Sequence, residues 1–346
     1  MTTAEAAPRE RGWRRLLPAL AVFLFVPAIP QLRLIVPIEQ TLLVLAPILA
    51  IAGWFGWREG GRLWWALTWS AIAIWVLSRP MAGGAEYVAF ARGWALVLAG
   101  SFGVTSLMAP ARSFFIRSVS TVGIAALIGG VVLGISGSGP RQLSRVIGAE
   151  IADRVDLSAA ALRERTTTPE WKEVERDNPD GAAAVRQMVD GIDEQLRALA
   201  PAGSLLFPAL LAFETLAALA LAWSLFHRLS RARIGPPLQP LREFRFDDQL
   251  IWGVIVGLVF VLVPGLSEAR EFGINVLVFF GALYAVRGLG VMSWFLVSPG
   301  RLFGSMVMIA VALIPVLWSI PLGLGLGDTW IDWRRRVRPA TPGSTQ

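Results

Sequence analysis

The sequence has no cysteine and a single histidine, His227. The first absence excludes disulfides, thiolate metal sites and a cysteine nucleophile. The second excludes multi-histidine metal sites and disfavours proton relays built on histidine. A phosphate-binding glycine loop, a dinucleotide-binding glycine pattern and a catalytic triad are also lacking from the sequence. We therefore predict that the protein has no metal and no cofactor, and that it is not an enzyme.

Charged residues are scarce too, at 16% of the 346 residues, whereas apolar residues make up 55%. A soluble domain has about 25% charged residues, so the chain has too few charges to cover a soluble surface. Mean hydropathy is +0.58. Arginine supplies nearly all of the basic charge and clusters at the ends of apolar runs, where membrane topology places it. The net charge of +7 therefore fits a protein whose partner is the lipid bilayer, and we expect no nucleic-acid binding.

Nine apolar segments are long enough to cross a bilayer, since a span needs about 20 apolar residues. Lipid offers no hydrogen-bond partners, so each segment should be helical. A transmembrane barrel would need short alternating segments instead. We predict an all-α fold, a polytopic transmembrane helix bundle of 8–9 membrane segments with an extracytoplasmic helical insertion. The segments are residues 16–36, 38–57, 63–79, 87–109, 117–137, 203–226, 250–266, 272–297 and 303–325.

Arginines in the connecting segments indicate the orientation. Residues 227–248 hold five arginines and should be cytoplasmic, because short cytoplasmic loops are rich in basic residues. Counting back places the N-terminus inside and residues 138–202 outside, and this outer segment has nine basic and twelve acidic residues. Counting forward through nine spans places the basic C-terminus outside. The parity therefore stays open, because the first or last segment could fail to cross fully.

The only sizeable soluble part is residues 138–202. Two amphipathic helices are predicted there, at about 141–165 and 180–200, and an apolar stripe from Val185 to Leu199 recurs at helical spacing. We expect this stripe to pack on its neighbour or on the membrane surface, and a docking site for another protein is the alternative. The predicted organisation is a tail (1–15), a first transmembrane block (16–137), the extramembrane segment (138–202), a second transmembrane block (203–327) and a basic tail (328–346).

Polar residues inside the apolar runs are the candidates for a binding site, because a charge in hydrocarbon costs roughly 2.5–3.5 kcal/mol or more. Glu214 lies near the middle of the sixth run, and Arg287 lies inside the eighth. Tyr284 shares a helix face with Arg287 at i, i+3 spacing. Arg92 is about five residues into the fourth run, close enough to its end for the side chain to reach the interface.

Glu214 and Arg287 should lie at comparable depths, and we predict that they form an ion pair in the bundle interior. Ala217 and Ala218 on the face of Glu214 would let another helix come close. A substrate or ion site that contains one or both charges remains an alternative. In a third arrangement, Arg287 reaches the cytoplasmic interface and Glu214 is protonated.

Two glycine pairs with small-xxx-small spacing lie in the apolar runs. They are Gly130 with Gly134, and Gly253 with Gly257. Such pairs let helix backbones approach closely, so both predict close helix packing and association.

Several stretches of the last third carry a family resemblance: residues 205–211, 244–252, 275–277, 288–289 and the closing stretch 325–334. Over 203–336 the chain resembles the YybS-like family of bacterial membrane proteins of unknown function. That family is distantly similar to the substrate-binding membrane subunits of energy-coupling-factor transporters. The resemblance implies a protein of the bacterial cytoplasmic (inner) membrane.

Two functions from different classes follow as expectations. In the first, the chain is a transport-related subunit that binds a small molecule, with Glu214, Tyr284 and Arg287 as polar contacts and a partner ATPase or coupling subunit. In the second, it is a membrane scaffold for envelope or division proteins, with residues 138–202 or the Asp328–Arg338 tail as a docking surface. The scarcity of charge in the spans favours the scaffold, because ion-coupled transporters usually hold several acidic groups there. The sequence leaves the oligomeric state open.

Overall fold

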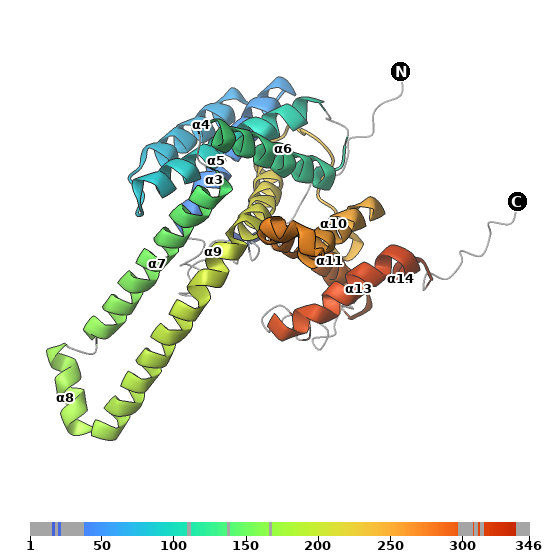
Figure 1. The fold of residues 1–346 in the computed structure, drawn as a ribbon. Coiled ribbons are helices and arrows are strands. Elements are labelled where there is room, and N and C mark those ends of the chain that lie inside the picture. Colours follow the sequence, from blue (N-terminus) through green and yellow to red (C-terminus); the bar gives the residue numbers. More distant parts are fainter. Residues whose placement is uncertain are drawn as a thin grey trace, which may run out of the picture. The chain divides into compact units, whose positions relative to one another are not determined.

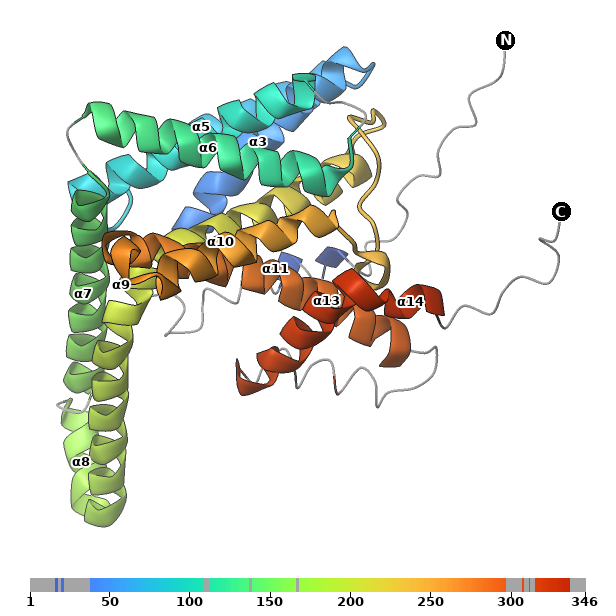
Figure 2. The same cartoon turned by 45° about the vertical axis from the view of Figure 1, so that its right-hand side comes forward.

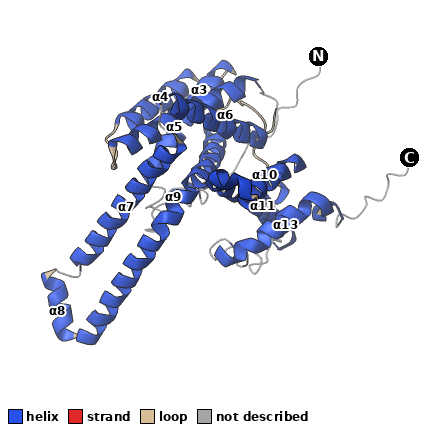
Figure 3. Ribbon diagram, in the orientation of Figure 1, coloured by secondary structure: helices blue, strands red, loops and turns tan. Residues whose placement is uncertain are grey.

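The structure, a computed structural model, describes residues 38–108, 112–136, 139–165, 168–296 and 315–336, together with 16–17, 20–21, 307 and 311. Every regular element within these ranges is a helix (Figure 3), so the all-α prediction is confirmed. The chain divides into two compact units, Met1–Pro237 and Leu238–Gln346, which are described separately below.

The first unit consists of a membrane block and an arm. In the block, α3 packs against α4, α5 and α9, and α5 packs against α6. The interior combines small and aliphatic side chains, such as Leu43 and Ala95, with large aromatic ones, such as Trp223 and Phe102, and each of these four is fully buried. The helices of this unit are α3 (Ile38–Arg58), α4 (Leu63–Ser78), α5 (Ala85–Met108), α6 (Phe114–Ile135), α7 (Pro140–Arg165), α8 (Pro169–Asp177) and α9 (Pro179–Leu229).

The arm is a helical hairpin in which α7 leads out from the membrane block, α8 forms the tip and α9 returns (Figures 1 and 2). Ile147, Ile151 and Leu196 are buried where α7 packs on α9. The predicted packing of the apolar stripe on its neighbour is thus confirmed at the end nearest the membrane block. At the tip end Val185 is 40% exposed.

Helix α9 is continuous over 51 residues, although Pro201 and Pro208 lie within it. It begins at an N-cap, where the Asn178 side chain accepts a hydrogen bond of 2.9 Å from the Gly181 amide, and Pro179 occupies the first turn, where its missing amide hydrogen costs nothing. The predicted helix 180–200 and the predicted span 203–226 are therefore one helix, and the boundary expected at residue 203 lies within it.

In the second unit, α11 is the central helix, since it contacts both α10 and α13. Gly253 and Gly257 of α10 face α11, where an added Cβ would meet Phe280 and Leu277. This glycine pair therefore packs closely, as predicted. The elements are η2 (Leu241–Glu243), η3 (Asp248–Leu250), α10 (Ile251–Leu262), η4 (Pro264–Ala269), α11 (Arg270–Leu296), η5 (Pro315–Trp318), α13 (Ser319–Ile331) and α14 (Trp333–Arg336).

Among the described residues, five helices are long and apolar enough to cross a membrane, and Leu63–Ser78 and Asp248–Leu262 are shorter apolar helices. The count of 8–9 segments is thus not confirmed. Pro264 limits one of the short helices, because the residue before a proline is driven out of helical geometry, and Val263 is extended. The predicted segment 16–36 lies mostly outside the described residues, and of the predicted segment 303–325 the structure describes 307, 311 and 315–325. The five long helices are Gln40–Arg58, Ala85–Met108, Phe114–Ile135, Ala200–Leu229 and Pro264–Leu296.

Candidate functional site

Helices α11 and α13 of the second unit cross (Figure 2), and a glycine of each helix lies at the crossing. A Cβ on Gly288 would overlap the carbonyl oxygen of Pro321, and one on Gly325 would overlap the carbonyl oxygen of Tyr284. The two backbones are therefore in direct contact at these positions. One turn beyond the contact of Gly325 with Tyr284, Asp328 of α13 meets Arg287 of α11.

Asp328 is the centre of a buried ion-pair network. Its Oδ2 atom accepts hydrogen bonds from Arg287 Nε at 3.0 Å and from Arg334 Nη2 at 2.7 Å. Its backbone carbonyl accepts another from Arg287 Nη2 at 3.1 Å. The three side chains are 0%, 4% and 3% exposed. Two guanidinium groups thus share one carboxylate that solvent does not reach.

The rim of this network joins the segment before α10 to α14. Asp248 Oδ1 accepts a hydrogen bond of 2.8 Å from Arg287 Nη1, and its side chain is 59% exposed. Arg334 Nη1 donates to two backbone carbonyls of residues 242–244 at 3.1 Å. Arg245 and Asp332 form a second ion pair. Asp248 brings the network around Arg287 to two acidic and two basic side chains, so their formal charges cancel.

The acidic partners of Arg287 are thus Asp328 and Asp248, not Glu214 as predicted. The sequence analysis assigned Asp328 to a basic tail that begins at residue 328. In the structure α13 continues to Ile331 and buries this carboxylate, so Arg287 finds its partner within its own unit. The predicted shared face of Tyr284 and Arg287 is confirmed, because both contact Phe246: Tyr284 at 5.0 Å between ring centroids, and the Arg287 guanidinium carbon at 5.2 Å from the ring centroid.

Glu214 lies on α9 of the first unit and has a different kind of partner. Its Oε1 atom accepts a hydrogen bond of 2.9 Å from the hydroxyl of Thr41 on α3. Its Oε2 atom is buried without a hydrogen-bond partner. Ala218, one turn further on, is fully buried, and α3 packs against α9. The small residues beside Glu214 therefore do admit a neighbouring helix, as predicted.

Arg92 serves as a helix cap. Its Nη2 atom donates a hydrogen bond of 2.7 Å to the carbonyl oxygen of Arg79, which is the C-cap residue of α4. Carbonyl groups at the end of a helix lack intrahelical donors, and a basic side chain also complements the negative end of the helix dipole. This capping contact explains why a charged residue lies near the end of an apolar run, and the explanation requires no bound ligand.

Sequence reasoning missed a polar cluster where the arm joins the membrane block. The hydroxyl of Tyr87 donates to Gln40, and the guanidinium of Arg154 lies 4.6 Å from the Tyr87 ring centroid. Arg154 pairs with Glu150 at 2.8 Å, and Glu150 also accepts a hydrogen bond from the Gly84 amide at 2.8 Å. The rarity of tyrosine could have pointed to this cluster. The sequence has two tyrosines, Tyr87 and Tyr284, and both are buried, at 1% and 0% exposed.

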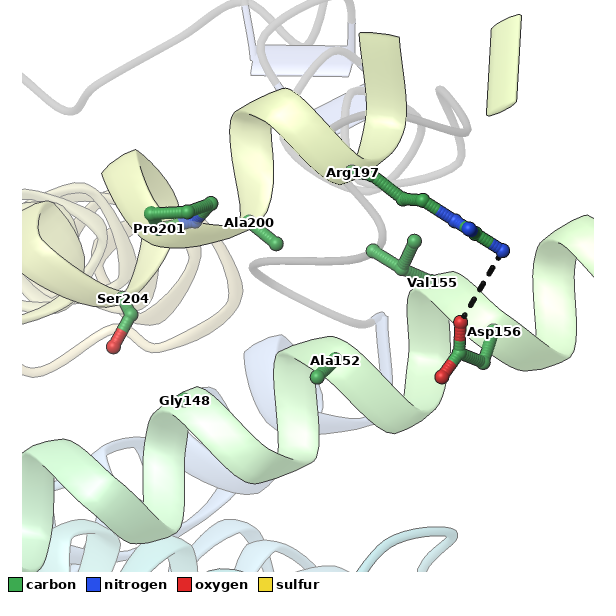
Figure 4. A pocket seen from close by; sticks show the side chains of 8 residues that line it. All are labelled: Gly148, Ala152, Val155, Asp156, Arg197, Ala200, Pro201 and Ser204. Carbon is green, nitrogen blue, oxygen red and sulfur yellow. Dashed lines mark ion pairs between the residues drawn. The ribbon is translucent and has the colours of Figure 1, made fainter. Parts of the chain in front are cut away.

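Two pockets flank α7 in the first unit. The one between α7 and α9 has a volume of about 370 Å³ and is lined by Gly148, Ala152, Val155, Asp156, Arg197, Ala200, Pro201 and Ser204 (Figure 4). The other has about 420 Å³, with walls from α5, α6 and α7, and is lined by Glu86, Ala89, Phe90, Gly93, Trp94, Val97, Gly129, Val132, Leu133, Gln142, Leu143 and Val146. Within the part of the chain that the structure describes, no group of three His, Cys, Asp or Glu side chains could hold a metal ion.

Residues 180–329 match the model of a family described as "Predicted membrane protein (DUF2232)". The matched stretch runs from the start of α9 to Thr329 of α13 and includes Glu214, Arg287 and Asp328. Its description gives a membrane location and no activity. No curated protein matches the chain, and no solved structure does. The family match agrees with the five long apolar helices, and the chain is a helical membrane protein.

Proposed function

We propose that the chain is a non-enzymatic membrane scaffold that uses its α7–α8–α9 arm to hold an envelope protein outside the membrane. The observation that carries the proposal is the continuity of α9, which runs from the tip of the arm through the candidate span Ala200–Leu229. A partner held on the arm is thereby coupled to the membrane helices without an intervening loop, which suits a scaffold.

The arm is stabilised by its own side chains. Arg163 pairs with Asp193 across the hairpin, and Arg186 pairs with Glu175 of α8 at 2.7 Å. The packing of Ile147 and Leu196 adds an apolar interior. Because these contacts fix the hairpin internally, its outer face is left for a partner.

Two exposed apolar side chains lie next to each other on α9, near the tip of the arm. Met188 is 67% exposed and Val185 is 40% exposed, and their i, i+3 spacing places them side by side. Residues 138–202 carry nine basic and twelve acidic residues. We therefore expect a partner with an apolar contact for this pair and a basic surface around it, such as a protein of the envelope or division machinery.

The charges of the second unit support the same choice. Every guanidinium nitrogen of Arg287 donates to Asp328 or Asp248, so this residue has little capacity left for a substrate. A transport subunit would need another polar contact in its place.

The test is affinity purification of the full chain from its native membrane in mild detergent, with quantification of the co-purifying proteins. We expect a stoichiometric envelope protein whose recovery falls about tenfold, equivalent to 1.4 kcal/mol, in the double variant Val185→Glu and Met188→Glu. The matched control is Ala183→Glu, an exposed position on another face of the same helix. Recovery of an ATPase or coupling subunit in place of an envelope protein would overturn the scaffold.

Orientation belongs to the same proposal: the N-terminus is cytoplasmic and the arm extracytoplasmic in a bacterial inner membrane. The chain has no cysteine, so Asp180→Cys at the exposed tip introduces a unique label site. A membrane-impermeant maleimide should label this variant in intact spheroplasts. A cysteine placed at Arg231, in the predicted cytoplasmic loop, should react after lysis only, and the reverse pattern would refute the orientation.

The second candidate is a substrate-binding membrane subunit of the energy-coupling-factor type. The apolar pocket of about 420 Å³ between α5, α6 and α7 favours it, because small-molecule sites are concave and mostly apolar, with a few polar groups. Glu86 and Gln142 supply polar groups in this pocket. This candidate requires the partner ATPase that the purification would reveal.

A further inference from the structure

The pocket between α7 and α9 lies at the base of the arm, where the chain enters the membrane. Its α9 wall spans Arg197 to Ser204, and the candidate span of α9 begins at Ala200. The polar headgroups of a bilayer occupy the zone just outside the hydrocarbon core. The pocket is therefore at the height at which lipid headgroups are found.

Small residues on both helices create the space. Gly148 and Ala152 on α7 face Ala200 and Pro201 on α9 across the pocket (Figure 4). At its inner end the helices are close, since a Cβ on Gly148 would lie 3.1 Å from Ser204 Oγ. The two charged residues, Asp156 and Arg197, lie at the other end of the pocket (Figure 4), and the volume of about 370 Å³ is enough for a small polar group.

The charged end of the pocket holds one cation and one anion that are poorly matched to each other. Arg197 Nη2 and Asp156 Oδ1 are 3.8 Å apart, and their side chains are 54% and 71% exposed. This separation exceeds hydrogen-bond distance. Asp193, by contrast, is bound by Arg163 and by Arg197 Nε at 3.2 Å. Asp156 is thus the carboxylate of this group with room for another cation.

The two charged side chains supply complementary contacts for a zwitterionic group. The Asp156 carboxylate is an acceptor for an ammonium group, while the Arg197 guanidinium is a donor for a phosphate.

We infer that the pocket binds the headgroup of a phosphatidylethanolamine lipid. The phosphate contacts Arg197, and the primary ammonium donates hydrogen bonds to Asp156. Phosphatidylcholine fits less well because its quaternary ammonium has no N–H donor. Phosphatidylglycerol has no cation for Asp156. The lipid fixes the base of the arm at the membrane surface, which is a role independent of any protein partner.

The test uses the full chain in phosphatidylcholine nanodiscs that contain a minor fraction of phosphatidylethanolamine or phosphatidylglycerol. After mild delipidation, mass spectrometry measures the lipid retained per protein. We expect phosphatidylethanolamine to be enriched over both other lipids. Asp156→Asn should reduce this enrichment about tenfold, as expected for the loss of one charged hydrogen bond, with circular dichroism unchanged because Asp156 is mostly exposed.

Two further variants separate a pocket from general charge. Ala152→Leu fills the space and should abolish the enrichment, whereas Ala160→Leu, on the same helix outside the pocket and also exposed, should leave it intact. Equal retention of phosphatidylglycerol, or an Asp156→Asn variant that behaves as wild type, would overturn the inference. Competition by free glycerophosphoethanolamine as effective as that by the bilayer lipid would show a soluble ligand and also overturn it.

Discussion

Arg287 in the second unit and Glu214 in the first are both ionisable residues within long apolar helices, yet their surroundings differ. Arg287 donates to two carboxylates and one backbone carbonyl. Glu214 has one hydroxyl donor, Thr41, and a second oxygen without a partner. The second unit thus neutralises the charge of its buried arginine, while in the first unit one carboxylate oxygen of Glu214 is buried without a hydrogen bond.

The difference shows what an ionisable residue in an apolar run does and does not imply. An isolated buried charge is costly, but a charge with a hydrogen-bonded counter-charge can belong to the scaffold of the fold. In the second unit this counter-charge, Asp328, is brought to Arg287 by the glycine crossing of α11 and α13. The three experiments below test this contrast, from the largest expected effect to the smallest.

Asp328→Asn should cause the largest loss of stability. The variant removes the carboxylate that Arg334 contacts and leaves Arg287 with the mostly exposed Asp248 as its remaining ionic partner. Breaking a buried ion pair costs about 3–5 kcal/mol. The measurement is the free energy of unfolding in mixed micelles by SDS titration, followed by circular dichroism. Asp248→Asn is the matched control. The Asp248 side chain is 59% exposed, and a solvent-exposed pair contributes about 1 kcal/mol or less. Equal losses for the two variants would show that Asp328 is not the centre of the network.

The glycine crossing should be the next most sensitive feature. Gly288→Ala and Gly325→Ala place a methyl group into the opposing backbone, and overpacking of this kind costs about 1–3 kcal/mol or more. Gly130→Ala and Gly134→Ala on α6 are the controls, because no atom lies within 4 Å of the added Cβ. These controls should be neutral or stabilised by up to about 1 kcal/mol, since alanine favours helix. Thermal unfolding in detergent, monitored by tryptophan fluorescence, distinguishes the two pairs, and similar shifts in both would argue against a close crossing.

Glu214→Gln should have the smallest effect. The amide oxygen can still accept the hydrogen bond from Thr41, and the substitution removes a charge that has no ionic partner among the described contacts. We expect a change of less than about 1 kcal/mol in the free energy of unfolding, within the usual value of one neutral hydrogen bond. The same SDS titration measures it beside Asp328→Asn. A loss as large as that of Asp328→Asn would show that Glu214 has an ionic partner and would remove the contrast between the units.

The glycine pairs show how far sequence patterns can be trusted. Gly253 and Gly257 pack against Phe280 and Leu277, as their spacing predicts, whereas Gly130 has open space at its Cβ. The two pairs have the same spacing and lie in similarly apolar runs. Spacing sets which residues share a helix face, but whether another helix covers that face depends on the packing of the whole unit.

The sequence predicted two residues of the candidate site, but it did not predict which acidic residue pairs with Arg287. Arg287 and Tyr284 were identified as buried polar residues on one face, and both are buried. Asp328 was missed because it follows three closely spaced glycines, Gly323, Gly325 and Gly327, and precedes an arginine-rich stretch, a composition typical of a chain end. Its burial depends on the backbone contact at Gly325, which no local pattern reports.

The sequence by itself determined that the chain is helical and embedded in a membrane, because hydropathy and the need for internal hydrogen bonds act within each segment of about 20 residues. It also predicted two helices within residues 138–202, where the structure has α7 and the first part of α9. The tertiary structure decided that the arm and the following span share one helix, that Arg92 caps α4, and that Arg287 pairs with Asp328. Those outcomes depend on which backbones come close enough for side chains of distant segments to meet, and that is a property of the packed helices.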